Sequence, residues 1–512
     1  MNTTTDRIDL ITEAAKRLHK PVFDGKQQPK EPAPRTDKLT NSYKVVSLEE
    51  AIRRSGLKDG MTISFHHHFR AGDKVVNMVV AKLAEMGYKD LHLAASSLID
   101  VHEPLIEHIR NGVISRISTS GLRGKLAQEI SHGLMKEPVV FRSHGSRGSA
   151  IASGELHIDV AFLGASSSDP MGNSCGYSRS ANAKSICGSI GYALPDAQYA
   201  DHVVILTDDL VPYPNRPSGI SEIDVDSVVV VESVGDSSKI SSGAIRDTKN
   251  PRDILLAQQA AKVIINSGYF KPGFSIQTGS GGASLAAVKY IRQSMIDQGI
   301  KASFALGGIT AHMVKMHQDG LIERLMDVQS FDKVAAESLR DDRMHKEVSS
   351  IEYASAQEPG SATHFLDIVI LSALEVDVDF NVNVLVGSDG IIRGAIGGHP
   401  DTAADSALSI IVCPLLRGRI PCIVDKVTTL ITPGSTVDVV VTEYGIAVNP
   451  RRPEIAERLR QAGMNIVDIA ALKERGERII GHADPLPFGD KVVGIVMNRD
   501  GSVMDVIRNI DA

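Results

Sequence analysis

Short apolar runs alternate with amphipathic helical segments along most of this chain. MTISF (61–65), DLHLAAS (90–96) and HIDVAFLGA (157–165) predict strands, and residues 73–87 between the first two have apolar positions at helical spacing. Near-continuous apolar strands separated by amphipathic helices are typical of parallel sheets that are buried on both faces. The pattern therefore predicts an α/β fold of mostly parallel sheets flanked by helices.

This pattern occurs twice. Residues 62–87 and 274–299 both run through strand, loop, helix and closing glycine, at an offset of 212 residues. A second pair, IDVAFLGASSSDPMGN (158–173) and LDIVILSALEVDVDFN (366–381), matches at an offset of 208. Two correspondences in the same order indicate tandem, duplicated α/β domains. We expect an N-terminal arm at 1–45, a first domain at 46–245 and a second domain at 246–512.

Composition narrows the classes of partner. The chain of 512 residues has a formal net charge of −7, 4% aromatic residues and no Trp, which argues against a nucleic-acid partner. Its four cysteines lack C-x-x-C spacing, so we expect free buried thiols, no metal site and a cytoplasmic protein. A signal peptide and an apolar run of about 18 residues are both absent from the sequence, so no membrane association is expected.

The loop TGSGGAS (278–284) is the strongest candidate for chemistry. It joins an apolar strand to a helix, and its glycines leave bare N–H groups that could hold an anion or a developing oxyanion. Ser284 stands where a dinucleotide-binding G-x-G-x-x-G motif needs glycine, and no G-K-[ST] follows, so nucleotide binding is disfavoured. A tight strand-to-helix turn is the structural alternative.

Two further motifs have competing interpretations. His66, His67 and His68 with Arg70 could form a polar active-site wall, a metal site or an exposed loop, although consecutive histidines do not share a helix face. GSDGIIRGAIGGH (387–399) suggests backbone pressed against a ligand, with a floppy loop as the alternative. Arginines near these glycines could clamp carboxylates.

Several ordered motifs together resemble a known family. TGSGGAS, SALEVDVDFNVN and GSDGIIRGAIGGH, joined by SFHHHFR, TSGLRGKLAQEIS, LGGIT and ITPGS, are similar to the coenzyme A transferase superfamily and, within it, to citrate lyase α subunits. The resemblance runs from about Ser47 to the C-terminus, and it implies two coenzyme A transferase-like domains with the active site between them.

The resemblance also implies a reaction. Citrate would displace acetate from an acetyl thioester to give a citryl thioester, which a partner β subunit would cleave to oxaloacetate and the acetyl thioester. The thioester carrier would be coenzyme A or the phosphoribosyl-dephospho-coenzyme A group of an acyl carrier protein, the γ subunit, with no permanently bound cofactor. Members of the family are cytosolic proteins of anaerobic citrate fermentation, and we expect a homo-oligomer.

One departure from the superfamily bears on mechanism. Related coenzyme A transferases use a glutamate nucleophile at the end of the strand after the glycine loop, but residues 303–310 (SFALGGIT) contain no carboxylate. Direct attack by a citrate carboxylate in a ternary complex, through a mixed anhydride, is therefore expected, with Glu375 as the reserve covalent residue. The alternatives are a stand-alone acetate:coenzyme A transferase and a non-catalytic scaffold.

These arguments give a set of expected site residues. The catalytic candidates are Gly279, Gly281, Gly282 and Glu375. The candidates for substrate binding are His67, Arg70, Arg123, Ser280, Gly307, Gly308, Asn383, Gly387, Gly390, Arg393, Gly397 and Gly398.

Overall fold

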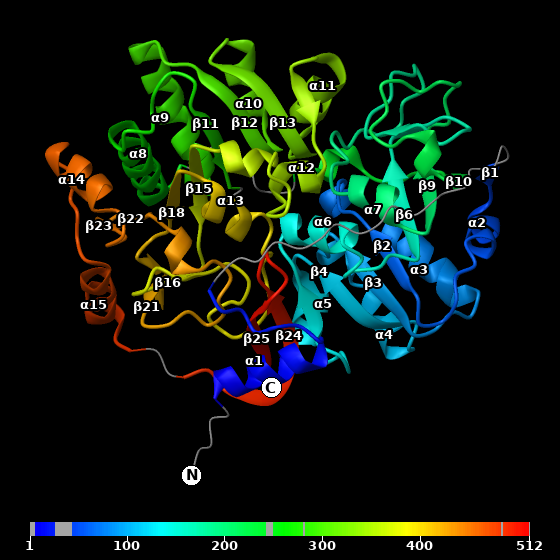
Figure 1. Ribbon diagram of the computed structural model, residues 1–512, viewed down its shortest axis with the longest axis horizontal. Coiled ribbons are helices and arrows are strands. Elements are labelled where there is room, and N and C mark those ends of the chain that lie inside the picture. Colours follow the sequence, from blue (N-terminus) through cyan, green and yellow to red (C-terminus); the bar gives the residue numbers. More distant parts are fainter. Residues whose placement is uncertain (1–5, 26–43, 242–248, 280–281, 483–484, 511–512) are drawn as a thin grey trace.

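Two large sheets, each flanked by helices, form the core of the fold (Figure 1). The computed structural model describes residues 6–25, 44–241, 249–279, 282–482 and 485–510. Within these ranges one sheet has ten strands and the other has eight. In Figure 1 the blue and cyan first half lies beside the green to orange second half, and the N-terminal helix lies below them.

The first sheet is parallel except for its last pair of strands. In spatial order its strands are β1 (Val45–Val46), β10 (Ser227–Val230), β9 (His202–Thr207), β6 (Val160–Ala165), β2 (Thr62–Phe65), β3 (Leu91–Ala95), β4 (Ile114–Thr119), β5 (Val139–Phe141), β24 (Phe488–Met497) and β25 (Val503–Ile510). Its helices are α2 (Leu48–Arg54), α3 (Val75–Glu85), α4 (Leu105–Arg110), α5 (Gly124–Ser131), α6 (His144–Ala152) and α7 (Leu194–Tyr199).

The second sheet is parallel except at β23. Its strands are β14 (His345–Glu347), β13 (Ile322–Ser330), β12 (Ala302–Ile309), β11 (Ser275–Thr278), β15 (Ile368–Ser372), β18 (Leu408–Val412), β22 (Val439–Thr442) and β23 (Gly445–Val448). Its helices are α8 (Pro251–Asn266), α9 (Gly282–Gln298), α10 (Ala311–Gln318), α11 (Lys333–Asp341), α12 (Ser350–Ala354), α13 (His399–Asp405), α14 (Pro453–Gln461) and α15 (Ile469–Ile480).

The duplication predicted from the sequence is visible in the topology. Seven strands of each sheet follow one spatial order, β10-β9-β6-β2-β3-β4-β5 in the first and β22-β18-β15-β11-β12-β13-β14 in the second. A matching contact accompanies it: Asp159 Oδ2 accepts the Thr62 N–H at 2.7 Å, and Asp367 Oδ2 accepts the Ser275 N–H at 2.9 Å. The expected α/β fold of two duplicated, mostly parallel sheets is confirmed.

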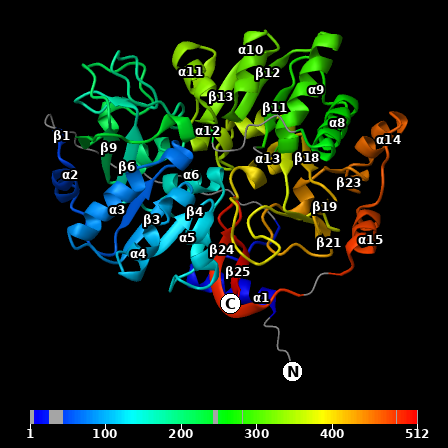
Figure 2. The ribbon, with the colours of Figure 1, turned by 180° about the vertical axis from the view of Figure 1, so that it is seen from behind.

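The C-terminal hairpin belongs to the first sheet, although the sequence placed it with the second domain. β24 pairs in parallel with β5 and continues the sheet past a three-residue strand. The hairpin also packs against α1 (Arg7–Arg17) of the N-terminal arm (Figure 2). Ala14 and Ala15 of α1 belong to the same buried apolar cluster as Ile495 and Val503 of the hairpin. Residues 1–5, 26–43 and 242–248 lie outside the described ranges, so the domain boundaries themselves stay a prediction.

The cysteines and the helices bear on two expectations from composition. All four cysteines are free and buried, which confirms the prediction of buried thiols. In the described parts of the chain, every helix is too short or too polar to cross a membrane.

A buried charged network joins the two sheets to the hairpin. Arg499, in the turn of the hairpin, donates Nη2 to Asp405 Oδ2 at 2.6 Å, and its Nε lies 3.8 Å from Asp401 Oδ1. Asp401 of α13 also accepts hydrogen bonds from Ser143 Oγ at 2.7 Å and from the Gly145 N–H at 3.0 Å, at the start of α6. The network therefore holds α6 of the first half against α13 of the second.

We predict that Arg499→Leu lowers the free energy of unfolding by about 3 kcal/mol, because it leaves two buried carboxylates without their counter-charge. Urea unfolding followed by circular dichroism measures the change. Arg53→Leu, at an exposed ion pair on α2, is the control and should change stability by no more than about 0.5 kcal/mol. An Arg499→Leu chain as stable as the wild type contradicts the role of the network.

Candidate active site

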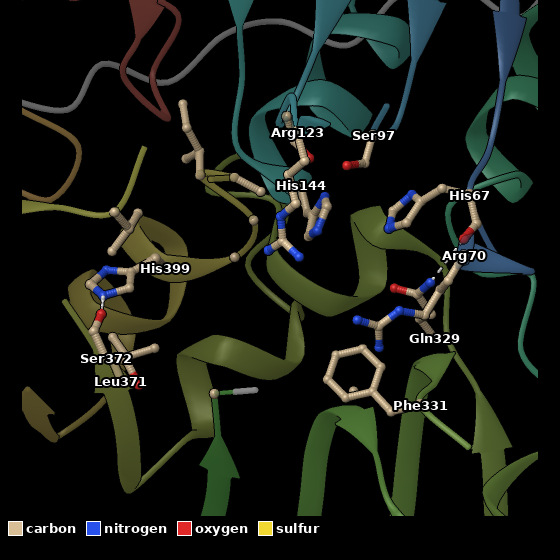
Figure 3. A pocket seen from close by; sticks show the side chains of 18 of the residues that line it. His67, Arg70, Ser97, Arg123, His144, Gln329, Phe331, Leu371, Ser372 and His399 are labelled. Carbon is tan, nitrogen blue, oxygen red and sulfur yellow. Dashed lines mark hydrogen bonds between the residues drawn. The ribbon is translucent and has the colours of Figure 1, made fainter. Parts of the chain in front are cut away.

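A cavity of about 510 Å³ opens where the carboxyl ends of the strands of both sheets meet (Figure 3). The first sheet contributes His67 after β2 and His144 after β5, and the second contributes Gly279 after β11 and Ser372 at the end of β15. Loops at the carboxyl ends of parallel strands are the usual place for ligands in open α/β sheets. Here two such edges face each other, so both halves build one site.

Arginine side chains give the cavity its positive charge. Arg70 and Arg123 both line it, and Arg417 lines it from the second half. Burial and the neighbouring Arg123 lower the pKa of the Arg70 guanidinium. The Arg70 guanidinium lies 4.8 Å from the centre of the Phe331 ring, and its buried Nη1 has no hydrogen-bond partner among the described residues. Two neighbouring guanidiniums with an unused donor are suited to a ligand with carboxylate groups.

The histidines of the cavity are neutral rather than cationic. His67 and His144 pack against Tyr192, with ring centres 5.3 and 4.2 Å from it. Burial lowers the pKa of His144 to about 3, and burial together with His144 lowers that of His67 well below its usual value. His67 Nδ1 lies 2.5 Å from Ser96 Oγ, a contact that fixes the ring. These side chains offer hydrogen bonds without adding charge.

Two members of the histidine run make contacts with the protein. His66 Nε2 lies 2.9 Å from the Gly164 carbonyl, and His67 is turned toward Ser96. In the described residues, the one group of side chains with metal-ligand spacing is His157, Asp159 and Asp201, and this group does not line the cavity. Of the three interpretations left open by the sequence, the placement of His67 and Arg70 matches the polar wall.

Further polar groups converge from the second half. His399 lies between Thr432 Oγ1, 2.7 Å from Nδ1, and the Ser372 carbonyl, 3.0 Å from Nε2. Gln277 donates Nε2 to the Tyr353 hydroxyl at 2.8 Å, whereas its buried Oε1 has no partner among the described residues.

Gly307 does not line the cavity, but it makes room for Gln277. Its φ is +95°, and a Cβ there would lie 2.8 Å from the Gln277 Cδ. Only glycine adopts such a backbone easily beside a packed side chain.

The described glycines of the loop 278–284 do not offer the free N–H groups in the cavity that the sequence predicts. Gly279 lines the cavity, but its N–H donates to the Ile370 carbonyl at 2.7 Å, so this amide is already used by the sheet. Gly282 begins α9 on the exposed surface and does not line the cavity. Ser280 and Gly281 lie outside the described residues.

Two other glycines of the cavity have unused amides. Gly397 and Gly398 line it, and neither N–H donates a hydrogen bond to any residue in the described ranges. They are therefore better placed than Gly279 to bind an anion or an oxyanion.

The first part of the second glycine cluster, residues 387–394, lies away from the cavity. Gly387 accepts a hydrogen bond from the Gly390 N–H at 2.9 Å in a turn in which Gly390 has a φ of +78°. Arg393 pairs with Asp389 on the surface. This half of the cluster forms a tight turn, so Gly387, Gly390 and Arg393 do not meet the other candidates.

Glu375 is also outside the cavity, on β16 (Glu375–Asp377) of a small three-stranded sheet. Its Oε2 accepts hydrogen bonds from the Thr428 N–H and from Asn383 Nδ2, both at 2.8 Å, and its Oε1 accepts one from Thr428 Oγ1 at 2.9 Å. Both Glu375 and Asn383 therefore support the fold locally. Among the described residues that line the cavity, the one carboxylate is the exposed Asp100.

Comparison with known proteins identifies the family. The family described as "Citrate lyase, alpha subunit (CitF)" matches residues 41–510. The chain belongs to the citrate lyase α-subunit family. It is 58% identical over 464 residues to the citrate lyase alpha chain of Escherichia coli K12, covering 91% of this chain and 90% of that one. The corresponding chain of Haemophilus influenzae is 54% identical over 481 residues, covering 93% and 95%.

Solved structures agree with this assignment. An α subunit of citrate lyase from Streptococcus mutans, solved in complex with citrate, superimposes with a TM-score of 0.92 at 52% identity and covers 96% of both chains. The α subunit of a malonate decarboxylase from Acinetobacter baumannii has a TM-score of 0.62 at 15% identity, covering 86% of this chain and 93% of that one, which shows a shared fold alone.

In this citrate lyase family member, the cavity brings together seven of the sixteen candidate residues. Seven of the candidates line the cavity: His67, Arg70, Arg123, Gly279, Gly308, Gly397 and Gly398. Residues that sequence reasoning missed include Ser97, His144, Tyr192, Gln277, Gln329, Phe331, Tyr353, Ser372 and His399. His144 could have been found because it comes soon after an apolar strand. Tyr192 precedes a short helix and Tyr353 lies within one, and neither has a local signal.

We predict a pH dependence of stability from His399 of this α subunit. Burial lowers the pKa of its imidazole from 6.5 to about 4. The unfolded state therefore binds a proton that the folded state does not, so the contribution of this group is present above pH 6.5 and is lost as the pH falls toward 4. His399→Gln should reduce the slope of unfolding free energy against pH, between pH 6 and 4.5, by up to about 1.4 kcal/mol per unit.

Urea unfolding at several pH values measures this slope. His482→Gln, at an exposed histidine, is the matched control and should keep the wild-type slope. An unchanged slope in His399→Gln contradicts the prediction.

Proposed function

We propose that this chain is the transferase subunit of citrate lyase, which exchanges acetyl for citryl on a carrier thiol. The proposed reaction is citrate + acetyl-carrier → citryl-carrier + acetate. Family membership gives the chain a role in citrate lyase. The single observation that most supports the specific reaction is a cavity with neighbouring Arg70 and Arg123 and no buried carboxylate among its lining residues.

The chemistry requires little more than positioning. A citrate carboxylate is ionised near neutral pH, so it can attack the acetyl carbonyl carbon without a general base. The C–S bond then breaks, leaving a citryl–acetyl mixed anhydride and the carrier thiolate. The thiolate attacks the citryl carbonyl carbon of the anhydride. The bond from that carbon to the bridging oxygen breaks, and the oxygen leaves with the acetyl group as acetate. Every atom is accounted for, and no residue of the protein becomes acylated.

The arginines and the glycine amides have separate tasks in this route. Arg70 and Arg123 would bind the carboxylates of citrate and offset their repulsion from the forming anhydride. The free N–H groups of Gly397 and Gly398 would stabilise the oxyanion at the attacked carbonyl, at roughly 3 kcal/mol for each well-aligned donor. The neutral imidazole of His144 leaves the positive charge concentrated on the arginines.

The carrier and partners follow from the same proposal. The thioester would be on coenzyme A or on the phosphoribosyl-dephospho-coenzyme A group of an acyl carrier γ subunit, and a β subunit would cleave the citryl thioester. The S. mutans relative was solved with citrate, and its similarity supports citrate as the acceptor here. We further propose a homo-oligomer that works in the cytoplasm.

We predict that Arg70→Gln raises the KM for citrate roughly 10- to 100-fold, because one charge-assisted clamp on a carboxylate is lost. Isolated chain, acetyl-coenzyme A or acetyl-carrier, and citrate are mixed, and acetate release is followed. Arg393→Gln is the matched control, since Arg393 is an arginine outside the cavity. Activity with free coenzyme A esters but not with the carrier would favour a stand-alone transferase, and no transfer by the wild type would favour a scaffold.

We predict that Glu375→Gln keeps transfer activity within about 10-fold of the wild type, because direct attack uses no enzyme carboxylate. A covalent glutamyl route would instead lose at least about 1,000-fold in kcat. Gln can keep the contacts to Thr428, so the fold should survive, and circular dichroism checks this. Isolation of a Glu375 thioester, or exchange of labelled acetate into acetyl thioester without citrate, would refute the direct route.

A further inference from the structure

A second cleft, of about 500 Å³, lies between the two halves away from the candidate active site. Its walls come from the loop after β8 (Ser174–Cys175), from residues 216–219, from the end of α11 and from β14. It shares no lining residue with the first cavity. Figure 1 shows the teal loops of the first half next to α11 of the second. We call this the arginine cleft, after Arg179, Arg216, Arg340 and Arg343.

The positive charge of the arginine cleft is only partly neutralised. Arg340 is paired with Asp341, with two contacts at 2.8 and 2.7 Å. Arg216 and Arg343 are exposed, and neither makes an ion pair or hydrogen bond with any part of the chain that the structure describes. Asp342 is the other aspartate in the lining, and its Oδ2 lies 3.0 Å from Nε2 of His317. Two guanidiniums are therefore left without protein partners.

The floor of the cleft is closed and its polar groups are already bonded. Cys175 is 2% exposed and donates Sγ–H to the Pro217 carbonyl at 2.7 Å. His345 is buried and lies 3.2 Å from Asp327 Oδ2. Glu347 accepts the Ile190 N–H at 2.8 Å, and burial raises the pKa of its carboxyl to about 7. A hollow with a buried floor suits a small ligand better than a flat protein surface, and a volume of this size is typical of small-molecule sites.

We propose that the arginine cleft binds a small polyanion with two or more phosphate or carboxylate groups. Guanidinium groups recognise both anions through paired N–H donors, and Arg216 and Arg343 have these donors unused. An aromatic base is not part of the expected ligand, because Tyr177, the aromatic ring in the lining, is covered by the Arg179 guanidinium at 4.9 Å. The proposal does not depend on the transfer reaction, since the cleft and the active site have separate residues.

Calorimetric titration of the full chain with inorganic pyrophosphate at low salt tests the phosphate form of the ligand. The Arg70→Gln chain is titrated as well, and with citrate too, so that the first cavity is weakened and the carboxylate form is tested. Saturable binding of either anion that persists in Arg70→Gln is the expected result. The anion with the lower dissociation constant shows whether the cleft prefers phosphate or carboxylate groups. Absence of saturable binding of both anions, or its loss in Arg70→Gln alone, overturns the proposal.

A double variant locates the site. Arg216→Ala with Arg343→Ala should weaken binding by roughly 10-fold or more, since each removes a charge-assisted contact. Arg53→Ala with Arg54→Ala removes the same charge from α2, at the far edge of the first half, and should leave binding within about 2-fold. Equal binding by the cleft variant and the wild type overturns the proposal. Both double variants change exposed side chains, and equal unfolding midpoints confirm that they are folded.

Discussion

The contact between α6 and α13 is the constraint on which the candidate active site depends. Asp401 of α13 accepts hydrogen bonds from Ser143 and from the Gly145 N–H, and the His144 N–H donates to the Gly397 carbonyl at 2.9 Å. His144 and Gly397 both line the cavity, one from each half. This contact therefore holds one wall of the cavity against the other.

Local charge, not the charge of the whole chain, makes an anion site here. The chain has a formal charge of −7, yet Arg70, Arg123 and Arg417 face a cavity whose one lining carboxylate is exposed. Burial keeps the imidazoles neutral, so their approach to the arginines adds no repulsion. A ligand with several carboxylates can then be held without competition from acidic side chains.

Sequence periodicity could predict the fold because it depends on local pattern. The repeats at offsets of 212 and 208 correspond to strands in the same place in two sheets, down to the paired contacts of Asp159 and Asp367. Pairing partners are not local: the predicted second domain (246–512) includes the C-terminal hairpin, whereas β24 pairs with β5 of the first sheet. The sequence does not show whether a backbone N–H is free to bind a ligand. The Gly279 N–H is not free, because it donates to the carbonyl of Ile370, 91 positions further along the chain.

The end of β12 explains why an anion clamp and a missing nucleophile occur together. The resemblance to coenzyme A transferases led us to expect a glutamate nucleophile near this strand end, where this chain has Gly307 and Gly308. A Cβ on Gly308 would lie 2.2 Å from the Phe331 ring, so no side chain fits there while the ring keeps its place. That ring lies against the Arg70 guanidinium. Glycine at 308 therefore leaves no room for a carboxylate side chain at this point and makes room for the ring that lies against Arg70. If the substrate supplies the nucleophile, binding and positioning that substrate contribute more to catalysis than a side-chain nucleophile at position 308 would.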